Sequence, residues 1–188
     1  IRISIKLVAM CIKNLYQPAS DEKIPQFLKG NITKSINLTG DAFFLKVFGS
    51  NTMVAEVYYE EFYKKIFYKG TVDIRIKEII RLRLAGISGC KYCISVDEHS
   101  AMKNGVSEVD IFNAKNNQID EFDDSLKNIL KLVNHISLSE ASERAEKEII
   151  EQALNDFSQE QFVEILFVTA ILAGMGNMLG SADLVETD

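Results

Sequence analysis

Apolar and polar positions follow a helical period along most of the chain, whereas strict one-to-one alternation is scarce after the first eight positions. The segment 52–68, TMVAEVYYEEFYKKIFY, shows this helical pattern clearly. We expect this helix to end at Gly70, because glycine accepts the left-handed conformation of a helix C-cap. The pattern as a whole predicts an all-α fold.

Cap residues divide the middle of the chain into further helices. Asp73 precedes the helical run 74–88 and can accept hydrogen bonds from its free backbone N–H groups. Gly89 ends that run, and a new helix is expected to start near Cys90 and to stop at Gly105. Further helices are expected over 108–115, capped by Ser107, and over about 122–136, 140–155 and 159–179.

No segment rich in Pro, Gly or Ser divides the chain, so we expect residues 1–188 to form a single domain with an N-terminal arm over about 1–30. The longest apolar stretch, 165–180, is shorter than the roughly 20 residues that a membrane helix needs. A buried core helix is therefore expected there, and no membrane partner.

Charge and cysteine content exclude several classes of partner. The net charge of −6 and the pI near 5.1 disfavour nucleic acid, because phosphate binding needs clustered Lys and Arg residues. Three cysteines are too few, and odd in number, for a secreted disulfide framework, so we expect a reducing, cytoplasmic setting. Cys11, alone in an apolar run, is expected to be a small buried hydrophobe.

Two cysteines stand three positions apart in GCKYCISVDEHSAMKNG, residues 89–105. Cys90 and Cys93 would share one helix face, close enough for a disulfide. The first turn also offers free N–H groups and the positive end of the helix dipole, which stabilise a thiolate. A redox dithiol is one interpretation, with Cys90 at the exposed end and Cys93 better shielded; a chance pair of buried cysteines is the other.

A structural zinc site is disfavoured because zinc needs four ligands, usually two such pairs or one pair with two histidines. Beyond the pair the chain offers only Cys11, His99 and His135, with no second close pair. We therefore expect no metal and no cofactor. His135 stands near a helix end, where a terminal or capping role is expected.

Glu78 is a candidate proton-transfer residue. Its helix neighbours Leu82, Ala85 and Gly86 are small or apolar, so its carboxylate points along a face where an unpaired charge is costly. Burial would raise its pKa toward the range useful for an acid or base. The alternative is an acid paired with a Lys or Arg residue at an interface.

These features together point to a known family. The sequence KEIIRLRLAGISGCKYCISVDEHSAMKNGVSEVDI, residues 77–111, resembles the core of the carboxymuconolactone decarboxylase and alkylhydroperoxidase D-like superfamily. It shares a Lys-Glu helix, a Cys-x-Tyr-Cys turn and a glycine at Gly105, and Glu78 precedes Cys90 by twelve residues, as in the family's peroxidase branch. The resemblance covers about 40–115 and implies a helical bundle that assembles as a trimer or hexamer.

The resemblance also implies thiol peroxidase or disulfide reductase chemistry. Cys93 would be the thiolate that attacks the hydroperoxide, Cys90 the resolving thiol and Glu78 a member of the proton relay. The family's relay histidine stands four residues after the second Cys, where this chain has Asp97. A carboxylate there raises the thiol pKa unless it is protonated, paired with a cation or shares a proton with Glu78. His99 lies on another side of the helix and is expected at the surface or a subunit contact, with a site role only through a bend or a neighbouring subunit.

Three functions remain open from the sequence. The first is a thiol oxidoreductase that reduces hydroperoxides and is regenerated by a reductant protein or a small thiol. The second is a dithiol–disulfide exchanger without peroxidase activity, and the third is a decarboxylase-like or non-redox binding protein. The aromatic residues of 58–68 are expected mainly in helix and subunit packing, with some lining an apolar pocket for an organic peroxide.

Overall fold

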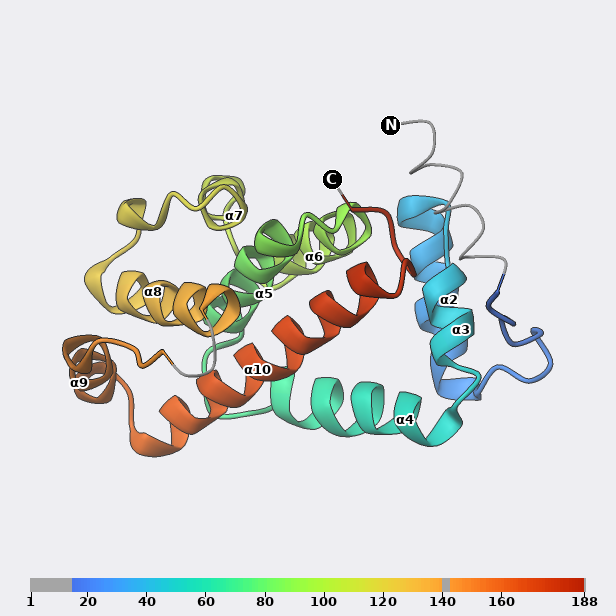
Figure 1. Cartoon of the computed structure of the whole chain (residues 1–188), viewed down its shortest axis with the longest axis horizontal. Coiled ribbons are helices and arrows are strands. Elements are labelled where there is room, and N and C mark those ends of the chain that lie inside the picture. Colours follow the sequence, from blue (N-terminus) through green and yellow to red (C-terminus); the bar gives the residue numbers. More distant parts are fainter. Residues whose placement is uncertain (1–14, 140–142, 188) are drawn as a thin grey trace.

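The computed structural model describes residues 15–139 and 143–187, and every regular element in these ranges is a helix (Figure 1). The all-α prediction is therefore confirmed, while Cys11 and the start of the expected N-terminal arm lie outside the described residues. The helices are α2 (Gln26–Thr39), α3 (Phe43–Phe48), α4 (Thr52–Glu56), η1 (Val57–Phe67), α5 (Ile74–Ser88), α6 (Lys91–Lys103), α7 (Glu108–Lys115), η2 (Ile119–Glu121), α8 (Asp124–Leu138), α9 (Lys147–Asp156) and α10 (Gln159–Ser181).

The predicted caps set the boundaries of the central helices. The side chain of Asp73 accepts from the backbone N–H of Arg75 at the start of α5. Gly89 ends α5 in the left-handed conformation, with φ of 60°. Ser107 accepts from the N–H of Asp110 and so caps α7. The helix expected from residue 140 begins only at Lys147 within the described residues.

The helix ends near Gly70 as predicted, but the reason predicted for a glycine there is wrong. Gly70 does not have the positive φ that a left-handed cap requires. A Cβ atom there would lie 2.2 Å from Oε1 of Glu164, whose carboxylate packs directly over the turn. Glu164 also pairs with the buried ammonium of Lys77 at 2.8 Å. Glycine is needed at this position because a side chain of α10 approaches the backbone closely.

The helix expected over 52–68 changes type along its length. Its first turn, α4, is an ordinary α-helix, and it continues as η1, a π-helix with hydrogen bonds five residues apart. The last of these bonds joins the N–H of Tyr68 to the carbonyl of Tyr63 at 2.9 Å. Long π-helices are rare and are often found at functional sites. The wider turn changes which aromatic side chains share a face.

The centre of the molecule is α5, which packs against α6, α7, α8 and α10 (Figure 1). Nine consecutive residues of this helix, 77–85, are buried, so it has no solvent-facing side in its middle. Four of the nine are charged: Lys77, Glu78, Arg81 and Arg83. A buried charge is costly without a partner, so the surrounding helices must supply hydrogen bonds and opposite charges.

The apolar stretch 165–180 lies in α10, which is longer than that stretch and runs from the side of α9 toward α2 (Figure 1). One side of α10 is buried through Ile165, Val168 and Leu172, but Val163 and Phe167 are 57% and 44% exposed. The expectation of a buried core helix therefore holds for one face only. Among the described residues α10 is also the one helix long and apolar enough to cross a membrane, by length and composition alone.

Candidate functional site

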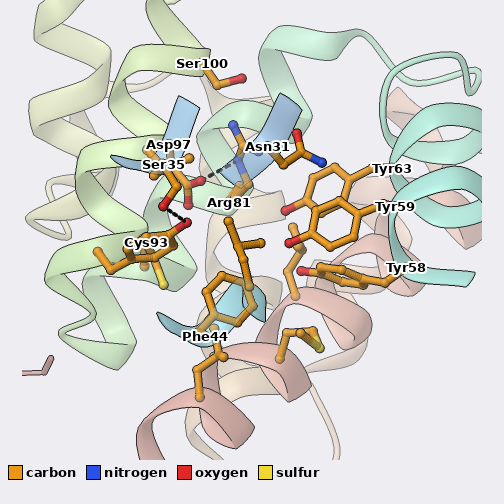
Figure 2. Close-up of a pocket in the computed structure, with 18 of the residues that line it drawn as sticks. Asn31, Ser35, Phe44, Tyr58, Tyr59, Tyr63, Arg81, Cys93, Asp97 and Ser100 are labelled. Atoms are coloured by element: carbon orange, nitrogen blue, oxygen red, sulfur yellow. Dashed lines mark hydrogen bonds and ion pairs between the residues drawn. The ribbon is translucent and has the colours of Figure 1, made fainter. Parts of the chain in front are cut away.

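A cavity of about 440 Å³ lies between α2, α3, η1, α5, α6 and α10, and Cys93 forms part of its wall. Its volume is in the range of sites for small organic molecules. Arg81 and Asp97 line the polar side, and tyrosines from η1 line another (Figure 2). The six helices are spread from α2 to α10 along the chain, so the cavity exists only in the folded protein.

The two cysteines lie at the start of α6, as predicted. Cys90 is the N-cap residue, and its Sγ accepts from the backbone N–H of Cys93 at 3.1 Å. The two sulfurs are joined in a disulfide, with the Cα atoms 5.2 Å apart. The two cysteines are therefore close enough to form a disulfide, and the helix N-terminus supplies a backbone donor to sulfur.

The expected order of exposure is reversed. Cys90 is only 1% exposed, whereas Cys93 is half-buried and lines the cavity. The cause is the C-terminal segment, which sequence reasoning did not place: Thr187 forms an isolated antiparallel bridge with Cys90, and Leu184 and Val185 are buried in the same apolar cluster. A ligand in the cavity can therefore reach Cys93 and not Cys90.

Arg81 is the charged centre of the site. Its guanidinium forms ion pairs with Glu78, one turn earlier on α5, and with Asp97, where Nε lies 3.2 Å from a carboxylate oxygen. The guanidinium also lies over the ring of Phe67, 4.9 Å from the ring centre, and near Tyr63 at 5.9 Å. Such contacts between a cation and aromatic faces stabilise a buried charge. Arg81 is thus held in place on three sides.

Glu78 is fully buried, and its carboxylate is saturated with donors. It accepts from Ser100 Oγ at 2.9 Å and Asn104 Nδ2 at 2.7 Å, besides the bond from Arg81. It is not among the residues that line the cavity. Glu78 is therefore an acid paired with an arginine, which was the alternative expectation for this residue. Glu78 does not touch the cavity itself, but it bonds Arg81, which does.

Asp97 lies one turn after Cys93 on α6, and both line the cavity. Burial raises the pKa of Asp97 to about 7. The charge of Arg81 acts in the opposite direction, Glu78 raises the pKa further, and Lys34 lowers it. The carboxyl group that replaces the expected histidine is therefore both paired with a cation and able to hold a proton near neutral pH.

The tyrosine wall follows from the π-helix. Most cavity-lining positions of this helix and the two residues after it recur every five residues, in the rows Tyr58, Tyr63, Tyr68 and Tyr59, Lys64, Lys69; Glu60 lines the cavity outside these rows. Figure 2 shows the hydroxyl groups of the first tyrosines directed toward the side of Arg81 and Asp97. Burial raises the pKa of Tyr63 to about 12, so this phenol stays protonated and can donate a hydrogen bond. Some aromatic residues of this segment thus line a pocket, while Phe62 and Phe67 are in the core.

The histidines lie elsewhere. His99 is half-buried on α6 and does not line the cavity. His135, near the end of α8, bonds through its ring nitrogens with the carbonyl of Glu143 and the hydroxyl of Ser139, which agrees with a terminal role. Among the described residues no group of three His, Cys, Asp or Glu side chains is arranged to hold a metal ion.

Sequence reasoning missed two parts of the site. Arg81 could have been found, because an arginine three residues after Glu78 lies on the same helix face. The wall from α2 could not, since no spacing links it to the cysteines; there Ser35 bonds Tyr92 at 2.8 Å, which ties α2 to α6 next to Cys93 (Figure 2).

The chain is similar to several known proteins. YdfG of Bacillus subtilis strain 168, an uncharacterized protein, is 25% identical over 126 residues, which cover 63% of this chain and 85% of YdfG. A peroxidase-related protein from Ralstonia eutropha JMP134, described as an alkylhydroperoxidase AhpD core, has a TM-score of 0.70 at 12% identity, covering 92% of this chain and 91% of its own. The debrominase Bmp8, solved with 2,3,4-tribromopyrrole, has a TM-score of 0.69 at 19% identity, covering 93% of this chain and 91% of its own.

The model of the carboxymuconolactone decarboxylase family matches residues 56–133. This range contains the π-helix, Glu78, Arg81, both cysteines of the disulfide and Asp97. The fold likeness to AhpD-like proteins extends over almost the whole chain. Residues 56–133 are thus similar to the carboxymuconolactone decarboxylase family, and the chain as a whole has the fold of AhpD-like proteins.

Proposed function

We propose that the chain is a thiol oxidoreductase that reduces organic hydroperoxides with Cys93 and Cys90. The observation that carries this proposal is the position of Cys93: it is disulfide-bonded to Cys90, lines the cavity and precedes a carboxyl group with a pKa of about 7 by one turn. The likeness to peroxidase-related AhpD proteins supports the same chemistry.

In the first step the Cys93 thiolate attacks the terminal oxygen of the hydroperoxide. A sulfur–oxygen bond forms and the oxygen–oxygen bond breaks, which leaves a sulfenic acid on Cys93 and an alcohol. The departing alkoxide needs a proton. Asp97, one turn after Cys93 and in the same cavity wall, is the candidate donor, and its pKa of about 7 suits this task.

In the second step the Cys90 thiol attacks the sulfenic sulfur of Cys93, and water leaves as the disulfide forms. The short Cα separation of 5.2 Å allows this bond without movement of the helix. A dithiol protein or a small thiol then returns the pair to the reduced state by exchange. A reducing compartment such as the cytoplasm would supply that reductant.

Glu78 and Arg81 act in this proposal as positioning residues. Glu78 holds the guanidinium of Arg81, and Arg81 in turn holds Asp97 at the cavity wall. His99 has no role in the proposed steps, because it does not line the cavity.

A second candidate is reductive dehalogenation of a halogenated aromatic ring. The tyrosine-lined cavity and the fold likeness to the debrominase Bmp8 favour it. The electron balance is the same: two thiols become a disulfide while a carbon–bromine bond is replaced by carbon–hydrogen and bromide leaves. Dithiol exchange alone and a decarboxylase-like role that does not use the thiols are the remaining alternatives.

We also propose that the chain forms a homo-oligomer, trimer or hexamer, through apolar surface left exposed on the single chain. The side chains of Val163 and Phe167 on α10 are examples of such surface. Sedimentation of the purified protein at several concentrations tests the assembly, and a monomer at all concentrations would contradict it.

Turnover assays separate the candidate functions. The reduced wild type should consume cumene hydroperoxide in the presence of a dithiol, and Cys93→Ser should lose this activity. Consumption at the wild-type rate by Cys93→Ser would remove the thiol mechanism. Bromide release from 2,3,4-tribromopyrrole without hydroperoxide turnover would favour dehalogenation, and turnover of neither compound with rapid reduction of a protein disulfide would favour exchange.

A further inference from the structure

One face of α2 forms a wall of the cavity. Phe27, Asn31, Lys34 and Ser35 line the cavity, and their spacing of four, seven and eight residues is that of a single helix face. The hydroxyl of Ser35 bonds that of Tyr92 at 2.8 Å, so this face is fixed against α6 beside Cys93. The α2 wall is therefore near the reacting sulfur although it is distant in sequence.

Two donors on this wall have no partner in the part of the chain that the structure describes. Among the described residues, neither the amide of Asn31 nor the ammonium of Lys34 makes a hydrogen bond or ion pair. Lys34 is half-buried, and burial together with the charges of Arg81 and Lys103 lowers its pKa, while the charges of Glu78 and Asp97 act in the opposite direction. A half-buried ammonium and an amide that face the same cavity without partners are suited to hold an anion.

The other charges of the cavity wall leave this anion site open. Arg81 is compensated by Glu78 and Asp97, and Lys64 is paired with Glu60 at 2.6 Å. The lining residues include four cations, Lys34, Lys64, Lys69 and Arg81, and two acids, Glu60 and Asp97; with Glu78 paired to Arg81 from behind, one positive charge is left in excess. A positive cavity in a chain with a net charge of −6 favours a negatively charged ligand.

We propose that Asn31 and Lys34 bind the carboxylate of an organic hydroperoxide, whose apolar body packs against the tyrosine wall while its peroxide group reaches Cys93. This inference rests on the proposed function and deepens it by naming the substrate class: a hydroperoxide of an aromatic or aliphatic carboxylic acid. Cys93 and the α2 wall border the same cavity, so both ends of such a molecule can be held at once.

Binding tests the carboxylate site without any turnover. Isothermal titration of the oxidised wild type with 4-isopropylbenzoate should show binding, and Lys34→Met should weaken it about tenfold, because a charge-assisted hydrogen bond is lost. The neutral 4-isopropylbenzamide should bind both proteins equally. Lys34→Arg should retain most of the affinity for the carboxylate. Lys29→Met is the matched control, since Lys29 is exposed on the same helix and does not line the cavity.

Turnover then connects the site to the reaction. The ratio of kcat/KM for the 4-carboxylate of cumene hydroperoxide to that for cumene hydroperoxide itself should fall about tenfold in Lys34→Met and stay constant in Lys29→Met. An unchanged ratio, together with equal benzoate affinity in Lys34→Met and wild type, would overturn the inference. Benzoate binding that depends on Lys34 without turnover of any hydroperoxide would support the anion site and contradict the proposed function.

Discussion

The guanidinium Nε of Arg81 lies 3.2 Å from the carboxylate of Asp97, and the same guanidinium also pairs with Glu78. One cation is therefore shared between two acids inside the protein. Sharing explains why Arg81 does not hold the pKa of Asp97 in its usual low range: burial and the charge of Glu78 outweigh the arginine and raise that pKa to about 7. Asp97, at the position where the family has a histidine, thus titrates in a pH range similar to that of a histidine side chain.

Asp97→Asn should change the pH dependence of the reaction. With wild type, kcat/KM for a hydroperoxide should fall as pH rises through about 7, because Asp97 loses the proton that the departing alkoxide needs. In the variant this limb should disappear and the rate should be about 10²-fold lower. Asp97→His is the matched test of the position and should recover part of the rate. The same falling limb in Asp97→Asn would exclude Asp97 as the donor.

Asp97 also makes stability depend on pH. Its pKa in the folded chain is raised above the value of 3.8 for the unfolded chain, so the folded state binds the proton more tightly. The free energy of unfolding of wild type should therefore fall relative to Asp97→Asn as pH rises from 3.8 to about 7, by at most about 1.4 kcal/mol per pH unit. Urea titrations at several pH values measure it. A constant difference would contradict the raised pKa.

Glu78→Gln should destabilise the chain strongly. The change removes one charge of a buried ion pair and weakens the bonds from Ser100 and Asn104, so a loss of about 3–5 kcal/mol in unfolding free energy is expected. Glu61→Gln is the control, because Glu61 pairs with Lys65 at the surface and should change stability by less than about 0.5 kcal/mol. Equal effects of the two changes would show that Glu78 is not a structural anchor of the site.

Gly70→Ala tests the close approach of α10 to the turn after η1. The new Cβ would meet Oε1 of Glu164 at 2.2 Å and the carbonyl of Ile66 at 2.5 Å, and overpacking of this kind costs about 1–3 kcal/mol. Gly30→Ala in α2 meets nothing within 4 Å and should stabilise the chain by about 0.5–1 kcal/mol. Thermal unfolding of the two variants should shift in opposite directions. A stabilised Gly70→Ala would contradict the packing described here.

The C-terminal segment should protect the disulfide from reductants. Truncation after Asp183 removes Leu184 and Val185, which pack in the cluster that contains Cys90. Reduction of the Cys90–Cys93 disulfide by dithiothreitol should then become at least several-fold faster, because both sulfurs become accessible. Glu186→Gln, which loses only an exposed ion pair with Lys91, should change the rate little. An unchanged rate after truncation would mean that reductants reach the pair through Cys93 alone.

Local sequence signals predicted the framework of the site well. The caps at Asp73, Gly89 and Ser107 and the cysteine pair at a helix start depend on neighbouring residues, and each is found as expected. Local signals failed where a distant element intervened. Gly70 is required by Glu164 of α10, and Cys90 is covered by the segment around Leu184, neither of which a local pattern can indicate.

The residues of the cavity likewise divide into those that local sequence signals indicated and those that depend on tertiary packing. The aromatic residues of 58–68 were visible in the sequence, but their alignment every five residues depends on a π-helix that a pattern with the usual helical period does not reveal. Glu78 was singled out for its apolar helix face, while its partner Arg81 was overlooked on the same face. The α2 wall with Lys34 is set by tertiary packing alone.

Chemical trapping on the reduced protein tests the central claim most directly. One equivalent of cumene hydroperoxide should convert the wild type to the Cys90–Cys93 disulfide, whereas Cys90→Ser should accumulate a sulfenic acid on Cys93 that dimedone labels, as seen by peptide mass spectrometry. Cys93→Ser should remain unlabelled and leave the hydroperoxide unreacted. A dimedone adduct on Cys90, or hydroperoxide consumed at the wild-type rate by Cys93→Ser, would contradict the account.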